Sequence, residues 1–146
     1  MNRKAINMEL SYEYIRGVVE GEGCFTFSKS NGRKIPAFAI RMHIRDKSLI
    51  CAIRDTLGLR NKVYVYDYQA KDRIERAPQA TLIVREFGQL KNIIVPFFYK
   101  RLRGNKRNQF ELWLEKIGND PSVPESFKFI YKIYKAGFYD KNPKFP

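Results

Sequence analysis

The order of apolar and polar residues along the chain predicts helices that alternate with pairs of strands. Apolar residues recur at helical spacing in five segments, within residues 10–19, 49–57, 87–95, 110–117 and 127–134. A period of two, typical of strands, marks four segments, at residues 24–30, 37–45, 63–68 and 79–85. The resulting order, α-β-β-α-β-β-α-α with a terminal helix, predicts an α+β fold and a single domain over residues 1–146, with residues 1–8 loose and 121–146 forming a C-terminal helix and tail.

The boundaries of these elements rest on local signals. The first helix is predicted from Ser11 to Glu20 or Gly21, and the strand at 37–45 places Arg41 and its alternate neighbours on a polar face. Asp46 is predicted to cap the second helix, which Gly58 should end. The helical segment at 87–95 is predicted to end before Pro96.

The change of period within residues 12–27 is the most informative feature of the pattern. Gly17 and Gly21 lie four residues apart, on one face of the first helix, beside Tyr14 and Val18. Because each glycine inside a helix costs ~1 kcal/mol relative to alanine, two on one face predict the close approach of another backbone. From Gly23 the helical period gives way directly to a strand.

Residues 15–23, Ile-Arg-Gly-Val-Val-Glu-Gly-Glu-Gly, resemble the LAGLIDADG motif of the homing endonucleases. Both acidic positions are kept, as Glu20 and Glu22, and so are the first and last glycines of the motif. Arg16 departs from the motif, since the family usually has a small or apolar residue there. The helix-into-strand context and the downstream order of elements extend the resemblance over roughly the whole chain.

The resemblance implies a saddle-shaped antiparallel sheet that lies on DNA, with the helices behind it. The chain carries one copy of the motif, and members with one copy act as homodimers. A two-fold axis through the glycine face would make a self-complementary contact. The dimer interface is therefore expected to contain Tyr14, Gly17, Val18 and Gly21.

The resemblance also places a metal at Glu22, the second acid of the motif, with help from the Gly21 carbonyl. Mg²⁺ or Mn²⁺ is the expected cofactor, because hard cations prefer carboxylate oxygens. Two Glu22 side chains facing each other across the dimer would repel unless cations lay between them. Glu20 is expected to hold the helix–strand junction through hydrogen bonds, although both acids could instead be ordinary solvated groups.

Lys106 is the second catalytic candidate, because the family has a lysine near the start of this helix that reaches the active site. Arg103 is the alternative, and it is also a candidate DNA contact. Residues 100–107 carry five basic side chains and no acidic one. For most of them the simpler interpretation is a loop that binds phosphates.

The polar face of the sheet is the predicted DNA reader, together with the hairpin turn that joins its first two strands. Its three tyrosines are unusual for a face that is only solvated. The sole histidine, His43, is interpreted as a DNA contact rather than a catalytic base. The full set of predicted contacts is Thr26, Ser28, Ser30, Arg33, Lys34, Arg41, His43, Arg45, Tyr64, Tyr66, Tyr68, Thr81, Arg85 and Arg103.

Composition agrees with a nucleic-acid partner. The 146 residues carry 28 Lys and Arg against 15 Asp and Glu, a net charge of +13. The two cysteines show no metal-binding spacing. No segment is apolar enough for a membrane span or a signal peptide, so we expect a cytoplasmic protein with no membrane partner and no cofactor other than metal.

Together these features predict a metal-dependent endonuclease that cuts both strands of a long, nearly palindromic DNA target as a homodimer. Water would attack phosphorus in line, without a covalent intermediate. Two alternatives stay open from the residues alone: an RNA-splicing maturase that binds without cutting, and a DNA-binding regulator on the same fold. Metal-dependent cleavage separates both from the nuclease.

Overall fold

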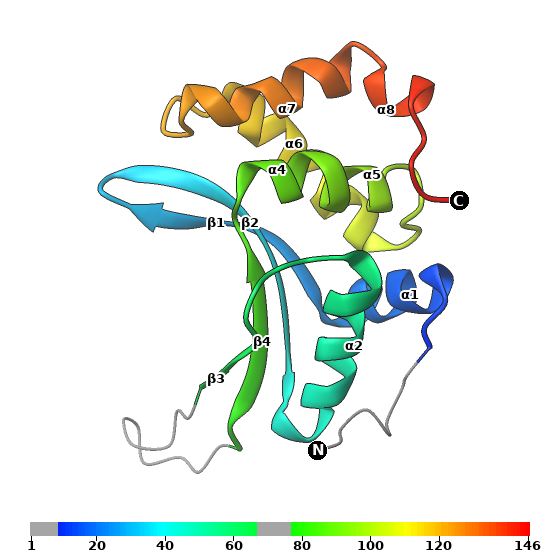
Figure 1. Ribbon diagram of the computed structural model, residues 1–146. Coiled ribbons are helices and arrows are strands. Elements are labelled where there is room, and N and C mark those ends of the chain that lie inside the picture. Colours follow the sequence, from blue (N-terminus) through cyan, green and yellow to red (C-terminus); the bar gives the residue numbers. More distant parts are fainter. Residues whose placement is uncertain (1–8, 67–76) are drawn as a thin grey trace.

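The computed structural model describes residues 9–66 and 77–146. The N-terminal segment 1–8, Tyr68 and most of the predicted charged loop at 69–77 lie outside the described residues. The remaining chain has the predicted α+β order, with helices collected on one side of a curved antiparallel sheet (Figure 1). That predicted fold class is confirmed.

Within the described residues, four strands form the sheet, in the spatial order β1-β2-β4-β3, and every neighbouring pair is antiparallel. Their bounds are β1 (Gly23–Ser30), β2 (Arg33–His43), β3 (Tyr64–Tyr66) and β4 (Gln79–Val84). The helices are α1 (Tyr12–Glu22), α2 (Lys47–Leu57), α4 (Phe87–Gln89), α5 (Val95–Phe98), α6 (Asn105–Asn119), α7 (Glu125–Lys135) and α8 (Phe138–Lys141).

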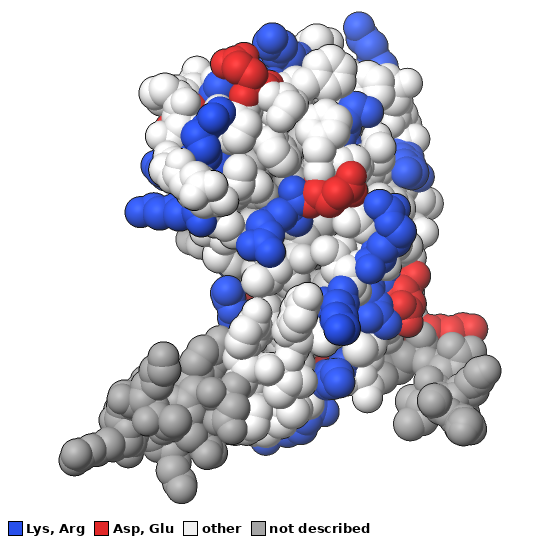
Figure 2. Space-filling view, turned by 60° about the vertical axis from the view of Figure 1, so that its left-hand side comes forward, with Lys and Arg blue, Asp and Glu red and all other residues white. Residues whose placement is uncertain are grey.

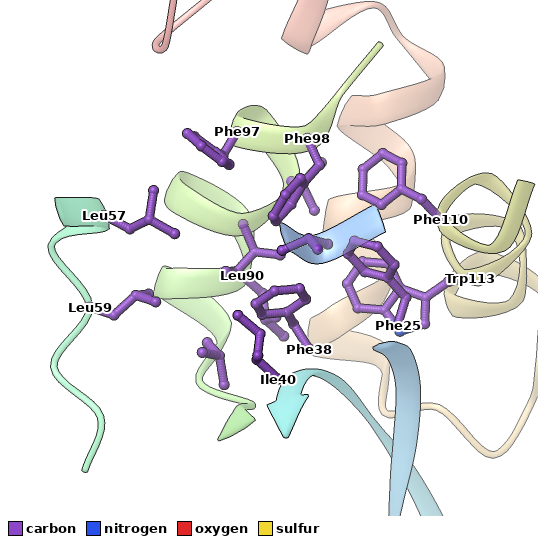
Figure 3. Packing of buried hydrophobic residues seen from close by; sticks show 14 of the residues in the cluster. Phe25, Phe38, Ile40, Leu57, Leu59, Leu90, Phe97, Phe98, Phe110 and Trp113 are labelled. Atoms are coloured by element: carbon purple, nitrogen blue, oxygen red, sulfur yellow. The ribbon is translucent and has the colours of Figure 1, made fainter. Parts of the chain in front are cut away.

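The core lies between the sheet and the helices. Phe25 of β1 and Phe38 of β2 are direct neighbours in the strand register, with ring centroids 5.3 Å apart. Phe98, Phe110 and Trp113 close over them from α5 and α6 (Figure 3). Side chains alternate between the two faces of a strand. The residues next to Phe25 and Phe38 in the sequence therefore point to the opposite face of the sheet, which the helices leave open.

Several predicted boundaries shift in the structure. Helix α1 runs to Glu22, one or two residues beyond the predicted end, and Ser11 caps it by accepting the backbone N–H of Tyr14. Gly58 ends α2 with a φ of 77°, as predicted, whereas the Asp46 side chain makes no capping hydrogen bond.

The prediction that the helix ends before Pro96 is wrong. The chain continues from α4 through a π-helical turn (Leu90–Ile94) into α5, which contains Pro96 in its first turn. Proline is tolerated in a first turn, where its missing N–H would have no helical partner. The wider hydrogen-bond spacing of the π turn therefore lets the helical path pass through the proline.

Two contacts fix α7 on α6. The Lys128 ammonium donates to the Ile117, Gly118 and Asp120 carbonyls at the end of α6, at 3.1, 3.3 and 2.7 Å. Gly118 lies so close to the Tyr131 ring that an added Cβ would come within 2.2 Å of it. Helix α7 is thus packed tightly against the C-terminal end of α6.

None of the helices in the described ranges is both long and apolar enough to cross a membrane.

Candidate functional site

The junction of α1 and β1 places Glu22 and Gly21 at the surface, next to the open sheet face. Both residues are exposed, and Glu22 makes no hydrogen bond or ion pair with any described residue. Gly23, which follows, is buried against Val19, where a Cβ would lie 2.6 Å from Cγ1. The turn from helix to strand therefore depends on glycine, and it presents a free carboxylate.

Glu20 has a different role from Glu22. Its carboxylate accepts the backbone N–H groups of Arg103 and Gly104, the latter at 3.1 Å, directly before α6 begins. The backbone N–H groups at the start of a helix have no hydrogen-bond partner within the helix, and the carboxylate at this position accepts them instead. Glu20 thus ties the motif helix to the start of α6, in line with the hydrogen-bonding role expected for it.

Lys106 reaches the same junction from the first turn of α6. Its ammonium donates to the Gly23 carbonyl at 2.6 Å and to Gln109 Oε1 at 3.4 Å. The structure therefore brings Lys106 beside the second half of the motif, although 83 positions separate it from Gly23. The Arg103 side chain is exposed and makes no hydrogen bond or ion pair with the described residues, so only its backbone is tied to the motif, through Glu20.

Most of the predicted DNA contacts share the open sheet face. The register places Gln79 between His43 on one side and Tyr66 on the other, and Arg33 opposite Ser30. The Arg85 guanidinium crosses the face to donate to Ser28 Oγ at 3.3 Å. Nine of the predicted contacts lie on this face or at its edge and have accessible side chains: Thr26, Ser28, Ser30, Arg33, Arg41, His43, Tyr64, Tyr66 and Arg85. Tyr68 lies outside the described residues.

Thr81 is a correction to that set, because its side chain is completely buried. It points to the predicted side of β4, but the register places it between Arg41 and Tyr64, two much longer side chains. A short residue between long neighbours in one row of a sheet is shielded by them. Its hydroxyl has no hydrogen-bond partner among the described residues.

Lys34 and Arg45 also lie elsewhere than predicted. Lys34 belongs to the helix-side alternation of β2, and its ammonium pairs with Asp120 at 2.9 Å. This pair and the Ser122 backbone next to it hold the pKa of Asp120 below its ordinary value. Arg45 is exposed, but β2 ends at His43, so Arg45 sits in the 3-10 turn that follows the sheet.

The visible surface beside the sheet carries many basic side chains and few acidic ones (Figure 2). Tyr64 and Tyr66 are both exposed, with ring centroids 6.3 Å apart on β3. A cationic surface with accessible rings and hydroxyl groups suits a nucleic acid, because it offers charge to phosphates and hydrogen bonds to base edges.

The glycine face of α1 is uncovered in the described chain. A Cβ added at Gly17 or Gly21 would meet no atom of the described chain within 4 Å. Tyr14 is 48% exposed beside them, while Val18 is half-buried at the edge of the core. The close backbone approach that the glycines predict is therefore absent from the described part of the subunit itself.

Arg16, the departure from the motif, is buried at 6% exposure and was not recognised as a structural residue from the sequence. Its Nε donates to the Phe97 carbonyl at 2.9 Å and its Nη1 to the Pro146 carbonyl at 3.3 Å. The guanidinium also lies over the Phe97 ring, 4.2 Å from the centroid. Burial, followed by repulsion from Arg101, lowers the pKa of Arg16.

A second set of contacts was also missed. Buried Gln89 accepts the Arg60 backbone N–H at 2.8 Å and donates to Asn61 Oδ1 at 2.9 Å. The Asn61 amide in turn donates to the Ile83 carbonyl at 2.9 Å. This chain of bonds anchors the segment that leads into Tyr64, and a lone glutamine within an apolar helical stripe gave no sequence signal for it.

Among the residues described for one subunit, no group of three or more His, Cys, Asp or Glu side chains is arranged to hold a metal ion. The groups at the junction that could bind a metal ion are a single Glu22 carboxylate and the neighbouring Gly21 backbone.

Comparisons with known proteins agree on one family. A family model described as LAGLIDADG endonuclease matches residues 15–117. The crystal structure of the homing endonuclease I-TnaI is similar at 27% identity and a TM-score of 0.58, over 74% of this chain and 71% of that one. I-LtrWI, solved bound to target DNA, matches at 27% identity and a TM-score of 0.59, over 73% of this chain and 36% of that one.

I-GzeII, solved in complex with a DNA target, is similar at 24% identity and a TM-score of 0.60, a likeness of fold. The alignment covers 89% of this chain and 45% of I-GzeII. The aligned part of this chain therefore spans less than half the length of I-GzeII and of I-LtrWI.

Proposed function

Because the chain belongs to the LAGLIDADG endonuclease family, we propose that it is a site-specific DNA endonuclease that cleaves both strands as a homodimer with the help of a divalent metal. The observation that carries the proposal is the meeting of Glu22 and Lys106 at one junction, at the edge of an open, basic sheet face. A free carboxylate and an ammonium group beside a basic surface are the groups that metal-assisted phosphodiester hydrolysis can use.

The residues at the junction fit a hard divalent cation. Glu22 has no competing hydrogen bond or ion pair in the described chain, so its oxygens are available as ligands. Mg²⁺ typically binds one or two carboxylates and keeps several waters, which one Glu22 from each subunit with the Gly21 carbonyls and DNA phosphates would satisfy. When bound, such an ion supplies Lewis-acid stabilisation of the negative charge that develops on the phosphate oxygens.

Lys106 would act on the phosphate side of the reaction. Its ammonium is anchored on the Gly23 carbonyl and is only partly buried, so it is held at the junction with donor capacity to spare. An ammonium in that position can orient the attacking water and stabilise charge on the phosphorane-like transition state. Neither group is a nucleophile toward phosphorus in this scheme, and no covalent intermediate forms.

The open sheet face would read the DNA sequence. Arg41 and Arg85 can donate to guanine edges, and hydroxyl groups such as that of Ser28 can bond to bases directly or through water. The strongly positive chain would supply the sequence-independent part of the affinity through phosphates.

Dimer formation is supported by the uncovered Gly17 and Gly21 face of α1. A two-fold contact through that face would bring two helix ends together, and so one Glu22 for each strand of a duplex. The pseudo-palindromic target follows from the same symmetry.

Cleavage of a randomised duplex library tests the proposal. With Mg²⁺, the protein should select and cut a related set of long sites, and EDTA should stop cutting. Glu22→Gln should bind the selected site with wild-type affinity while cleavage falls by at least about 10³-fold. Binding of the library without any metal-dependent cutting would contradict the nuclease and favour a non-cleaving binder.

A further inference from the structure

A pocket of about 460 Å³ lies beside the glycine face of α1, and Gly17 forms part of its wall. Its lining carries two acidic side chains, Glu13 and Glu20, and a majority of basic ones. The basic residues of this cationic pocket are Arg16, Lys100, Arg101, Arg103 and Arg107.

The charges of the cationic pocket are incompletely matched within the subunit. Lys100 pairs with Asp140 at 2.9 Å and Arg107 with Glu111 at 3.3 Å. Arg16 Nη2, by contrast, is buried without a hydrogen-bond partner in the described chain. The Arg103 side chain likewise makes no hydrogen bond or ion pair with the described residues. Arg101 uses one of its donors on the Phe145 carbonyl, at 3.2 Å. All four guanidinium groups that line the pocket thus keep donors that no described residue accepts.

Helix geometry determines which part of a second subunit lies next to the pocket. With 3.6 residues per turn, Tyr14 projects about 60° to one side of Gly17, and Glu13 about 40° to the other. Glu13 lies on the pocket side. Two parallel helices related by an axis along their length place the Tyr14 side of one against the Glu13 side of the other.

We propose that Tyr14 of the partner subunit fills the cationic pocket, so that each of the two pockets is completed only in the dimer. This placement rests on the homodimer proposed above, and it adds that Tyr14 of the partner subunit is the residue that enters the cationic pocket. Tyr14 is 48% exposed in one subunit and has no role in its core.

The chemistry of a tyrosine suits the pocket. The face of its ring attracts guanidinium groups, and its phenolic oxygen accepts hydrogen bonds from arginine. Its hydroxyl proton can be donated to Glu13 or Glu20, which line the same pocket. An aromatic anchor in a fully enclosed pocket is also the usual form of a strong interface contact.

Cross-linking between subunits tests the placement. Tyr14→Cys and Arg103→Cys are prepared separately in a background in which Cys24 and Cys51 are alanine, then mixed and treated with a short bis-maleimide. The mixture should yield a covalent dimer on a denaturing gel, and neither variant alone should do so. A covalent dimer from Tyr14→Cys alone would place the two tyrosines against each other and overturn the proposal.

A matched pair of charge variants gives a second reading. Tyr14→Glu would put a carboxylate among the arginines and should leave the dimer dissociation constant within about threefold of wild type, whereas Tyr14→Lys should raise it at least about tenfold. Equal weakening by both variants would refute the placement.

Sedimentation of the wild-type protein with its DNA separates the two levels of failure. A protein that stays monomeric on its target would refute the proposed homodimer itself. A dimer that gives no mixed cross-link and no difference between the charge variants would refute this placement alone.

Discussion

Replacing Glu20 by alanine should destabilise the fold, whereas replacing Glu22 should not. Glu20 accepts two backbone N–H groups, from Arg103 and Gly104, and so joins α1 to the start of α6. Glu22 is exposed and bonds to no described residue. The two acids are two positions apart and of the same type, so each variant is a matched control for the other.

The magnitude follows from the two hydrogen bonds. Bonds to a charged group contribute about 1.5–3 kcal/mol each when buried, and the partial exposure of Glu20 reduces this, so we expect a total loss of about 2–3 kcal/mol. Glu20→Gln keeps one acceptor and should lose roughly half as much. Glu22→Ala should change the free energy of unfolding by less than about 0.5 kcal/mol.

Urea unfolding, followed by circular dichroism, measures these differences. With an m-value of about 2 kcal/mol per molar urea, Glu20→Ala should lower the midpoint by about 1 M at an unchanged slope. Protein concentration must be fixed throughout, because the proposed dimer would stabilise the folded state by mass action. Equal midpoints for Glu20→Ala and wild type, or equal losses for both alanine variants, would refute the division of roles.

Four further predictions concern packing, dimerisation, pH and salt. Gly118→Ala should lower the free energy of unfolding by about 1–3 kcal/mol in the same urea assay, because its Cβ would meet the Tyr131 ring at 2.2 Å. Gly17→Leu should weaken dimerisation and cleavage together, as sedimentation and cutting assays would register, while the circular dichroism of the subunit stays native. The pKa of Asp120 is held below its ordinary value of 3.8, chiefly by Lys34, so this contribution to stability is complete at neutral pH and disappears as pH falls below about 4. Urea unfolding should therefore show a smaller loss of stability between about pH 6 and pH 3 for Asp120→Asn than for wild type. An equal loss in both proteins would show that the Lys34–Asp120 pair does not contribute to the pH dependence of stability. Binding to the selected DNA should weaken steeply with salt, and a titration slope near zero would contradict a phosphate-binding surface.

The order of the elements and the two faces of the sheet could be predicted from the amino-acid sequence. Both follow from local periodicity, which reflects the average burial of each position: Phe25 and Phe38, on the apolar alternation of their strands, are buried, and Arg41, placed on the polar face, is exposed. The motif at 15–23 likewise indicated the family, because its glycines and acids are adjacent in the chain.

The partner of each polar side chain, in contrast, depends on how distant elements pack together. Glu20 and Glu22 look alike in the sequence, and their difference depends on residues 103 and 104, more than eighty positions away. From the sequence alone, Lys34 looks like an unpaired surface cation, but the fold places Asp120 beside it and the two form an ion pair. Such pairings arise from the packing of distant elements, so no local pattern encodes them.

The burial of Thr81 and the path of the helix through Pro96 also depend on tertiary packing. Thr81 has the correct alternation for the open face, yet its long neighbours Arg41 and Tyr64 come from two other strands and cover it. Pro96 has a strong local tendency to end a helix, but the preceding π turn shifts the hydrogen-bond spacing so that the helical path continues. Local preferences of one or a few kcal/mol yield to tertiary packing, which sums many contacts over the whole core.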